Sequence, residues 1–317
     1  MPRLDARVKG PFQATAGDIE EINRVFSAAF TERYHRDGMA GVRVPTLNPV
    51  VWRYAIANAG AGALLWRDDL GHLAAFNMVH RSGLEGWMGP LAVRPDCQGA
   101  GLGKTIVREG LSRLKAAGAK TIGLETMPRT IENIGFYGAL GLRPGHLTVT
   151  MTWEAYQSED RSHPGAARVD WPRSSQAAGA LAERLMPGVD FSREFELTEQ
   201  LSLGGLTVVP HGAEVEAFGL WHTVALAETR AGDELRVLKL GATHERSFAA
   251  LVLELQEEAL ARRLRRVSIR SQTACGWAFG LLVKLGFRVH WTDLRMTLVG
   301  HEEQPVRDGV VWSNWEI

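Results

Sequence analysis

Short sequence patterns of the first half recur in the same order in the second half of the chain. This repetition limits the possible folds more than any other feature of the sequence. Residues 75–80 (AFNMVH) have a counterpart in residues 217–222 (AFGLWH), 142 positions later. Residues 140–143 (LGLR) are echoed by residues 285–288 (LGFR), 145 positions later. Echoes in the same order at nearly the same offset indicate a duplicated unit. The alternative is a chance coincidence of generic strand and helix patterns.

The first half alternates strand and helix patterns. Residues 101–117 show the clearest helical spacing, and the runs on either side are short and strand-like. This alternation predicts an α/β fold of the α+β mixed-sheet kind, in the order β-α-α-β-β-β-α-β-α-β. The expected strands lie near 12–15, 62–66, 72–80, 85–93, 120–126 and 144–153, and the helices start near 18 and cover 48–58, 101–117 and 130–140.

A polar, irregular stretch follows the first half and predicts a linker over residues 156–166. It divides the chain into a domain of residues 1–155 and a second of residues 167–317. Two domains suit a length of 317 residues. In the second half, a strand at 233–240 precedes a long helix at 245–263, which repeats the order of the first half.

The amino-acid composition argues against several classes of binding partner, namely nucleic acids, metal ions and membranes. Thirty-six Lys and Arg balance thirty-six Asp and Glu, so no excess of positive charge favours nucleic acid. The two cysteines, Cys97 and Cys275, lack the spacing of metal ligands or of a disulfide framework. No apolar run approaches the ~20 residues of a membrane span, and no signal peptide is recognisable. We expect a cytoplasmic protein without a metal or a membrane partner; its oligomeric state stays open.

The segment from Leu91 to Thr105 (LAVRPDCQGAGLGKT) runs from a strand through a glycine-rich turn into a helix. Such a junction directs several backbone N–H groups and the positive end of a helix into one cavity, which suits a phosphate group. Glycines allow the close approach and the positive φ angles that other residues resist. The segment therefore predicts a phosphate-binding loop.

Three kinds of phosphate loop compete for this segment. A Walker A loop fits at Gly103, Lys104 and Thr105, but its first glycine would fall on Gln98. A dinucleotide fingerprint fails because its third glycine would fall on Lys104. The remaining pattern, Gln/Arg-x-x-Gly-x-Gly, is met by Gln98, Gly101 and Gly103.

This last pattern, placed after Val-x-Pro at the start of a helix, resembles the coenzyme A loop of the GNAT superfamily of N-acetyltransferases. The resemblance covers residues 12 to 153, and the predicted order of elements agrees with that fold. It implies two tandem acyl-CoA N-acyltransferase (GNAT) domains. The C-terminal copy is degenerate, because residues 240–247 hold one glycine and Leu282 stands where the first half has Tyr137.

The resemblance implies acetyl-CoA as acyl donor, with no metal. Backbone groups of the strand before the loop would pair with the pantetheine arm, at Leu91, Ala92 and Val93. Loop amides would hold the pyrophosphate, at Gln98, Gly99, Ala100, Gly101, Leu102, Gly103 and Lys104. The Lys104 side chain either adds charge or is a solvated lysine at a helix start. The family usually has an asparagine that contacts the coenzyme seven residues before its tyrosine. Here Thr130 stands there, so this coenzyme contact is either weakened or made by the Thr130 hydroxyl.

Acyl transfer to an amine needs a neutral amine and a proton donor for the leaving thiolate. The family's last helix carries a tyrosine beside the coenzyme sulfur, which matches Tyr137 as general acid; a core aromatic is the alternative. Glu125 lies twelve residues before Tyr137, the spacing of a glutamate in relatives that acetylate protein N-termini. It is a candidate base, unless it is paired with a basic side chain. His80 is a further candidate by residue type.

These observations predict an N-acetyltransferase (EC 2.3.1.-) that moves an acetyl group to a primary amine by direct attack, in the N-terminal domain. The amine belongs to a small molecule or a peptide. A non-catalytic acyl-CoA-binding sensor and a nucleotide hydrolase are the alternatives. The acceptor pocket is expected near residues 26–48 and the facing surface of the second half. The side chains expected there favour a polar or acidic acceptor without selecting one. They are Phe30, Tyr34, His35, Arg36 and Arg43.

Overall fold

We describe the protein from a computed structural model, which covers residues 8–155, 170–212 and 214–314. The predicted linker over 156–166 lies outside the described residues. None of the helices in these ranges is long and apolar enough to cross a membrane.

The first half has the predicted order of elements. Its strands are β1 (Lys9–Gln13), β2 (Ala63–Arg67), β3 (Leu73–Ser82), β4 (Glu85–Val93), β5 (Thr121–Thr126) and β6 (Leu142–Glu154). Its helices are α1 (Ile19–Arg36), α2 (Pro49–Ala59), α3 (Leu102–Ala116) and α4 (Ile131–Gly138), with short 3₁₀ helices at Ala16–Asp18, Gly60–Gly62 and Pro95–Cys97. The predicted first strand, near 12–15, begins three residues earlier, and the other boundaries agree to within a few residues.

The second half repeats this order from its first helix onward. Its helices are α5 (Trp171–Leu185), α6 (Ser192–Gln200), α7 (Glu245–Ala261) and α8 (Gly276–Lys284). Its strands are β7 (Gly204–His211), β8 (Glu214–His222), β9 (Glu234–Ala242), β10 (Arg266–Gln272), β11 (Arg288–Leu298) and β12 (Val310–Ser313). The echoed segment 75–80 lies in β3 and its counterpart 217–222 lies in β8, so the two segments occupy matching strands.

All strands join one twelve-stranded mixed sheet, in which the two halves exchange their last long strands. The strand order is β1-β2-β3-β4-β5-β11-β6-β10-β9-β8-β7, with β12 paired to β9. Strand β11 of the second half lies between β5 and β6, and β6 of the first half lies between β11 and β10. Neither half therefore completes its sheet alone.

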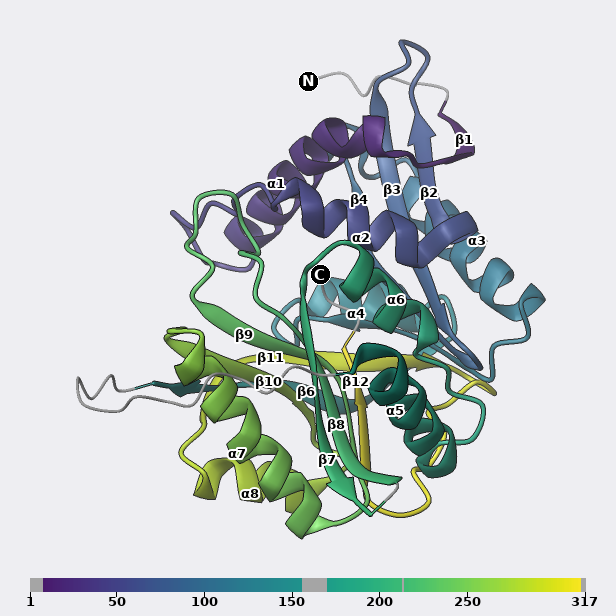
Figure 1. Ribbon diagram of the computed structural model, residues 1–317. Coiled ribbons are helices and arrows are strands. Elements are labelled where there is room, and N and C mark those ends of the chain that lie inside the picture. Colours follow the sequence, from purple (N-terminus) through teal and green to yellow (C-terminus); the bar gives the residue numbers. More distant parts are fainter. Residues whose placement is uncertain (1–7, 156–169, 213, 315–317) are drawn as a thin grey trace.

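Helices cover both faces of the sheet in each half (Figure 1). In the first half, α1 and α2 pack on one face around Trp52, and α3 packs on the other around Ile106. In the second half, α5 and α6 pack on one face around Phe218, and α7 and α8 pack on the other around Phe248. The helical spacing of apolar residues supplies each of these contacts. The structure has the mixed α/β fold that the sequence predicts.

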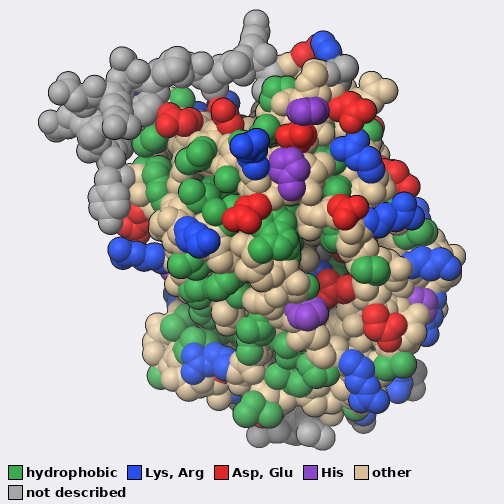
Figure 2. Space-filling model, turned by 90° about the horizontal axis from the view of Figure 1, so that it is seen from below, with side chains coloured by type: hydrophobic (Ala, Val, Ile, Leu, Met, Phe, Trp, Pro, Cys, Tyr) green, Lys and Arg blue, Asp and Glu red, His purple; other side chains and the backbone are tan. Residues whose placement is uncertain are grey.

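Charged side chains of both signs are mixed on the surface. Figure 2 shows acidic and basic groups interspersed over one face of the molecule, without a large area of a single sign. This distribution agrees with a formal net charge of zero at pH 7.

Candidate active site

The glycine-rich loop connects β4 to α3, as the sequence predicts. Gly99 and Gly101 have φ angles of 82° and 86°, which is left-handed backbone that residues with a Cβ rarely adopt. A Cβ on Gly103 would lie 3.4 Å from the ring of Phe136. The three glycines thus let the chain turn sharply and approach α4 closely.

Side chains fix this loop against the strands behind it. The Gln98 side-chain amide donates to the Val93 carbonyl at 3.0 Å. The Arg94 guanidinium forms ion pairs with Asp68 at 2.8 Å and with Asp96 at 2.7 Å. In the described part of the chain, no backbone carbonyl accepts a hydrogen bond from the amides of residues 99–103. These unpaired amides lie just before and at the start of α3, where the helix dipole also favours an anion.

A gap opens between β4 and β5 beside the loop. The two parallel strands pair from Glu85 with Thr121 to Met88 with Leu124 and then separate. Beyond that point, Leu91 to Val93 pair with β3 along one edge only. A cavity of about 540 Å³ lies beside this part of β4, and its lining includes Leu91, Ala92, Val93, Gln98, Gly99, Gly101, Gly103, Lys104, Asn133, Phe136 and Tyr137.

Tyr137 lies on α4 at the inner end of this cavity and is 7% exposed. Burial raises its pKa to about 12, so the phenol keeps its proton at neutral pH. Within the described residues, its hydroxyl has no hydrogen-bond partner. Tyr54, by contrast, accepts a hydrogen bond from Asn58 at 3.3 Å. The Tyr137 hydroxyl is therefore available as a proton donor to a group in the cavity.

A second cavity, of about 230 Å³, adjoins the first and shares five lining residues with it. These shared residues are Phe30, Arg33, Leu91, Asn133 and Tyr137. The second cavity also reaches Gly89 and Pro90 of β4, Glu125 of β5 and three side chains of the second half. Both halves of the chain therefore contribute to the space around Tyr137.

Glu125 lies in this second cavity with both carboxylate oxygens engaged. Oε1 accepts hydrogen bonds from Thr148 Oγ1 at 2.5 Å and from Arg295 Nη1 at 2.6 Å. Oε2 accepts one from Arg270 Nη2. Burial by itself would raise the pKa of Glu125, but the two arginines and the hydrogen bonds lower it below the ordinary value of 4.5. Of the two roles that the sequence left open, this geometry favours a paired carboxylate, and the lowered pKa makes Glu125 a weak proton acceptor.

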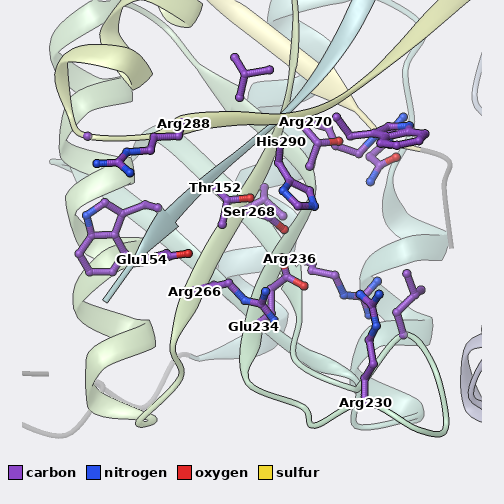
Figure 3. Close-up of a pocket in the computed structure, with 18 of the residues that line it drawn as sticks. Thr152, Glu154, Arg230, Glu234, Arg236, Arg266, Ser268, Arg270, Arg288 and His290 are labelled. Carbon is purple, nitrogen blue, oxygen red and sulfur yellow. The ribbon is translucent and has the colours of Figure 1, made fainter. Parts of the chain in front are cut away.

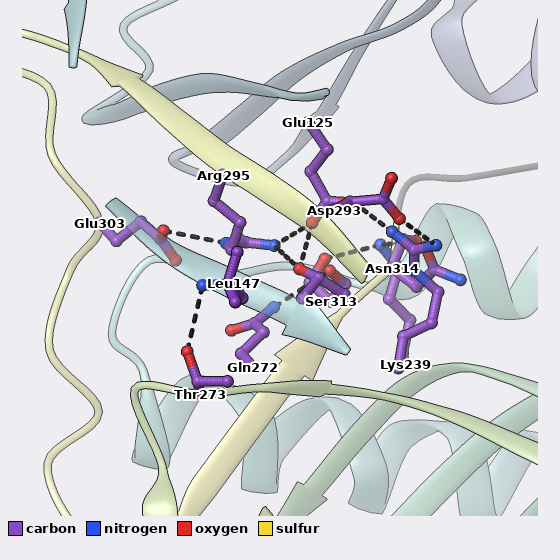
Figure 4. Close-up of polar contacts among 12 residues, drawn as sticks. Glu125, Leu147, Lys239, Gln272, Thr273, Asp293, Arg295, Glu303, Ser313 and Asn314 are labelled. Atoms are coloured by element: carbon purple, nitrogen blue, oxygen red, sulfur yellow. Dashed lines mark hydrogen bonds and ion pairs between the residues drawn. The ribbon is translucent and has the colours of Figure 1, made fainter. Parts of the chain in front are cut away.

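The partners of Glu125 belong to a longer chain of alternating charges. Arg270 also pairs with Asp293 at 3.1 Å, and Arg295 pairs with Glu303 at 2.9 Å. Figure 4 shows Arg295 between Glu125 and Glu303. Sequence reasoning missed Arg270 and Arg295, because they lie on β10 and β11, 145 and 170 residues after Glu125. Only the strand exchange brings them to this site.

Thr130 and His80 have structural partners. The fully buried Thr130 hydroxyl donates to Asp37 at 2.6 Å and joins the start of α4 to the end of α1. Thr130 is absent from the lining of the 540 Å³ cavity beside the glycine-rich loop. His80 Nε2 donates to the Gly89 carbonyl at 2.9 Å. Burial lowers the pKa of His80 to about 4, so its ring is neutral and supports the backbone of β4.

The second half has different residues at the matching positions. Residues 240–242 continue β9, and α7 begins at Glu245 with His244 as its cap. Leu282 of α8, which stands where Tyr137 would be, is fully buried in the core. The described part of this half contains neither a glycine-rich phosphate loop nor a phenol at the end of a cavity.

Part of the first half is similar in sequence to known proteins. Residues 20–142 match the model of the acetyltransferase (GNAT) family. The chloroplastic serotonin N-acetyltransferase 2 of Oryza sativa subsp. japonica is 27% identical over 128 residues, which are 40% of this chain and 58% of that protein. The chain thus spans little more than half the length of this curated relative.

Two solved structures share the fold over nearly the whole chain. A GCN5-related N-acetyltransferase from Sphaerobacter thermophilus has a TM-score of 0.59 at 17% identity, covering 97% of this chain and 98% of that one. A tandem GNAT protein from the clavulanic acid biosynthesis pathway has a TM-score of 0.58 at 11% identity, covering 92% and 98%. These structures show that nearly the whole chain has the same fold, whereas the match to the acetyltransferase (GNAT) family covers residues 20–142.

Proposed function

We propose that the N-terminal half is an acetyl-CoA-dependent N-acetyltransferase that acts on a primary amine. One observation carries the proposal: a single cavity leads from the free amides of the glycine-rich loop to the hydroxyl of Tyr137. Residues 1–155 and 167–317 would then be tandem GNAT domains, of which the first is active. The repeated order of elements and the likeness to a tandem GNAT protein support this division.

In this proposal the loop and β4 bind the coenzyme. The amides of residues 99–103 hold the pyrophosphate at the start of α3, where backbone donors and the helix dipole act together. The edge of β4 from Leu91 to Val93 pairs with the amide groups of the pantetheine arm, because that edge has no strand partner. The thioester then lies beside Tyr137 at the inner end of the cavity.

The reaction is a direct displacement. The neutral amine nitrogen attacks the thioester carbonyl carbon, a C–N bond forms, and the C–S bond breaks. The Tyr137 hydroxyl gives its proton to the leaving sulfur, and the proton lost by the amine returns to the phenol through solvent. We assign no proton transfer to Glu125, whose carboxylate holds Arg270 and Arg295 in place.

A coupled thiol-release assay over a panel of primary amines tests the proposal. Tyr137→Phe should lower kcat by about 100- to 1000-fold, the range of a lost general acid, with the Kd for acetyl-CoA changed less than about threefold. Tyr54→Phe is the matched control, because this buried tyrosine packs against His222, away from the cavity. Unchanged kcat in Tyr137→Phe would contradict the assignment of the acid.

The two alternatives give different results in the same experiments. Tight acetyl-CoA binding without turnover of any amine would support a non-catalytic sensor. Binding of Mg-ATP in preference to coenzyme A would support a nucleotide hydrolase. Calorimetry with both ligands separates these outcomes before any acceptor is known.

A further inference from the structure

A third cavity, of about 740 Å³, lies on the exchanged strands and continues from the space around Tyr137. It shares Tyr34, Arg270 and Trp291 with the cavity that holds Glu125. We call this third cavity the basic groove, because five arginines and His290 line it, against two glutamates, Glu154 and Glu234. The arginines are Arg230, Arg236, Arg266, Arg270 and Arg288.

Strand register places four polar side chains of the groove in one row across the sheet. Arg288 of β11 is opposite Thr152 of β6, and Thr152 is opposite Ser268 of β10. Ser268 is in turn opposite Arg236 of β9. Figure 3 shows the two hydroxyl groups on the floor of the groove, with Arg288 on one side and Arg236 on the other. Two hydroxyls between two guanidinium groups match the oxygens of an anion.

Three members of this row, the two hydroxyls and Arg288, have donors that the described structure leaves unused. Among the described residues, the hydroxyls of Thr152 and Ser268 have no hydrogen-bond partner, and Arg288 has no ion-pair partner. Arg236 uses one Nη atom to donate to the Val224 carbonyl at 2.8 Å. At the edge of the groove, Arg266 pairs with Asp233 at 3.0 Å, yet its buried Nε has no acceptor in the described structure. A buried donor without a partner is costly unless a ligand or solvent satisfies it.

The remaining charges divide the groove into a neutral part and a positive part. Arg270 is balanced by Glu125 and Asp293. Arg266 is flanked by Glu154 and Glu234 on the neighbouring strands. Among the described residues no carboxylate pairs with Arg288, so the positive charge of the groove is strongest at the Arg288 end of the row.

We propose that the acceptor is an amine that carries an anionic group, and that the Arg288–Thr152–Ser268–Arg236 row binds this group. The inference rests on the proposed function, because the amine must reach the thioester beside Tyr137. Ser268 and Arg270 are two residues apart on β10, about 7 Å along a strand. Because Arg270 lines both the groove and the cavity that contains Tyr137, the anion lies at least roughly 7 Å from the amine. The acceptor is thus an elongated amino acid or a comparable amino phosphate.

Three acceptors of equal length test this inference: 8-aminooctanoate, 8-aminooctyl phosphate and the uncharged 8-amino-1-octanol. The wild-type protein should have a KM at least about tenfold lower for the anionic acceptors than for the alcohol. The ratio of carboxylate to phosphate identifies the preferred anion. Arg288→Met and Arg236→Met should each raise KM for the anionic acceptors by about 10- to 100-fold, the range of a lost charged hydrogen bond. In both variants, KM for the alcohol and kcat for all three acceptors should change less than about threefold.

Arg184→Met is the matched control, because Arg184 is an exposed arginine of the same half that pairs with Glu214 on the surface. Equal KM values for the three acceptors in the wild-type protein would overturn the inference while leaving the acetyltransferase intact. So would an equal effect of Arg288→Met on the charged and uncharged acceptors.

Calorimetry with 8-aminooctanoate on the coenzyme-A-loaded protein gives a readout that needs no turnover. Loss of binding in Arg288→Met would support an anion site in the basic groove. If no amine were acetylated in the same study, only the proposed function would fail. Binding of equal strength in the wild type and in Arg288→Met would contradict the groove directly.

Discussion

The gap between β4 and β5 in the first half is open, whereas the matching gap between β9 and β10 in the second half is filled. In the first half, Leu91 to Val93 have β3 on one edge and a cavity on the other. In the second half, Lys239 to Ala242 have β8 on one edge and β12 on the other. In the second half, β12 thus occupies the position that corresponds to the proposed binding place of the coenzyme arm in the first half.

Several contacts hold β12 in this place. The buried ammonium of Lys239 donates to Ser313 Oγ at 2.8 Å and to the Asn314 carbonyl at 3.3 Å. Gln272 of β10 donates to the Ser313 carbonyl at 3.4 Å. Trp312 packs edge-on against Phe248 of α7, with ring centroids 5.4 Å apart. One fold therefore leaves a cavity in one half and forms a closed core in the other, according to what fills the gap.

The largest effect on this comparison should come from Trp312→Ala. Removing a buried tryptophan from the strand that fills the second gap should lower the free energy of unfolding by about 4 kcal/mol. Urea unfolding measures it. Trp277→Ala is the matched control, since Trp277 also packs against Phe248 but is 37% exposed, and it should cost less than half as much. Equal losses in the two variants would show that β12 is not part of the core.

Glu125→Gln should cause a smaller loss of stability than Trp312→Ala. This substitution removes the carboxylate of the first half that pairs with two arginines of the second half. Removing the carboxylate leaves Arg270 and Arg295 without their shared partner, at a cost of about 3 kcal/mol at pH 7. Glu132→Gln is the control, because this exposed carboxylate pairs with Arg33 at the surface and should cost less than 1 kcal/mol.

The same variant has a pH signature. The pKa of Glu125 is lowered in the folded protein, so its stabilising effect is present above the ordinary value of 4.5 and is lost as the pH falls through the lower folded value. The difference in stability between the wild type and Glu125→Gln should therefore shrink as the pH falls below about 4.5. A difference that stays constant would contradict the paired carboxylate.

The smallest effect should come from Thr130→Val. It removes the buried hydrogen bond to Asp37 and should cost about 1 kcal/mol of stability. Because Thr130 lies outside the cavity lining, the Kd for acetyl-CoA should stay within about twofold. A tenfold weaker Kd measured by calorimetry would restore Thr130 as a coenzyme contact.

Local patterns are enough to predict the order of elements and the glycine-rich turn between β4 and α3, because each depends on residues close together in the chain. The exchange of β6 and β11 could not be predicted, since strand register between distant segments leaves no local signal. For that reason Glu125 was assigned without Arg270 and Arg295, and the basic groove between the exchanged strands was not foreseen. Thr130 was likewise placed by spacing to Tyr137, whereas its hydroxyl is directed to the distant Asp37.

Calorimetric titration with acetyl-CoA tests the difference between the two halves most directly. We predict one site per chain, lost in Gly101→Val because valine resists the left-handed backbone at this position. His244→Ala, at the matching turn of the second half, should leave both the stoichiometry and the Kd unchanged. Two sites per chain, or binding that survives Gly101→Val and is lost in His244→Ala, would contradict the account.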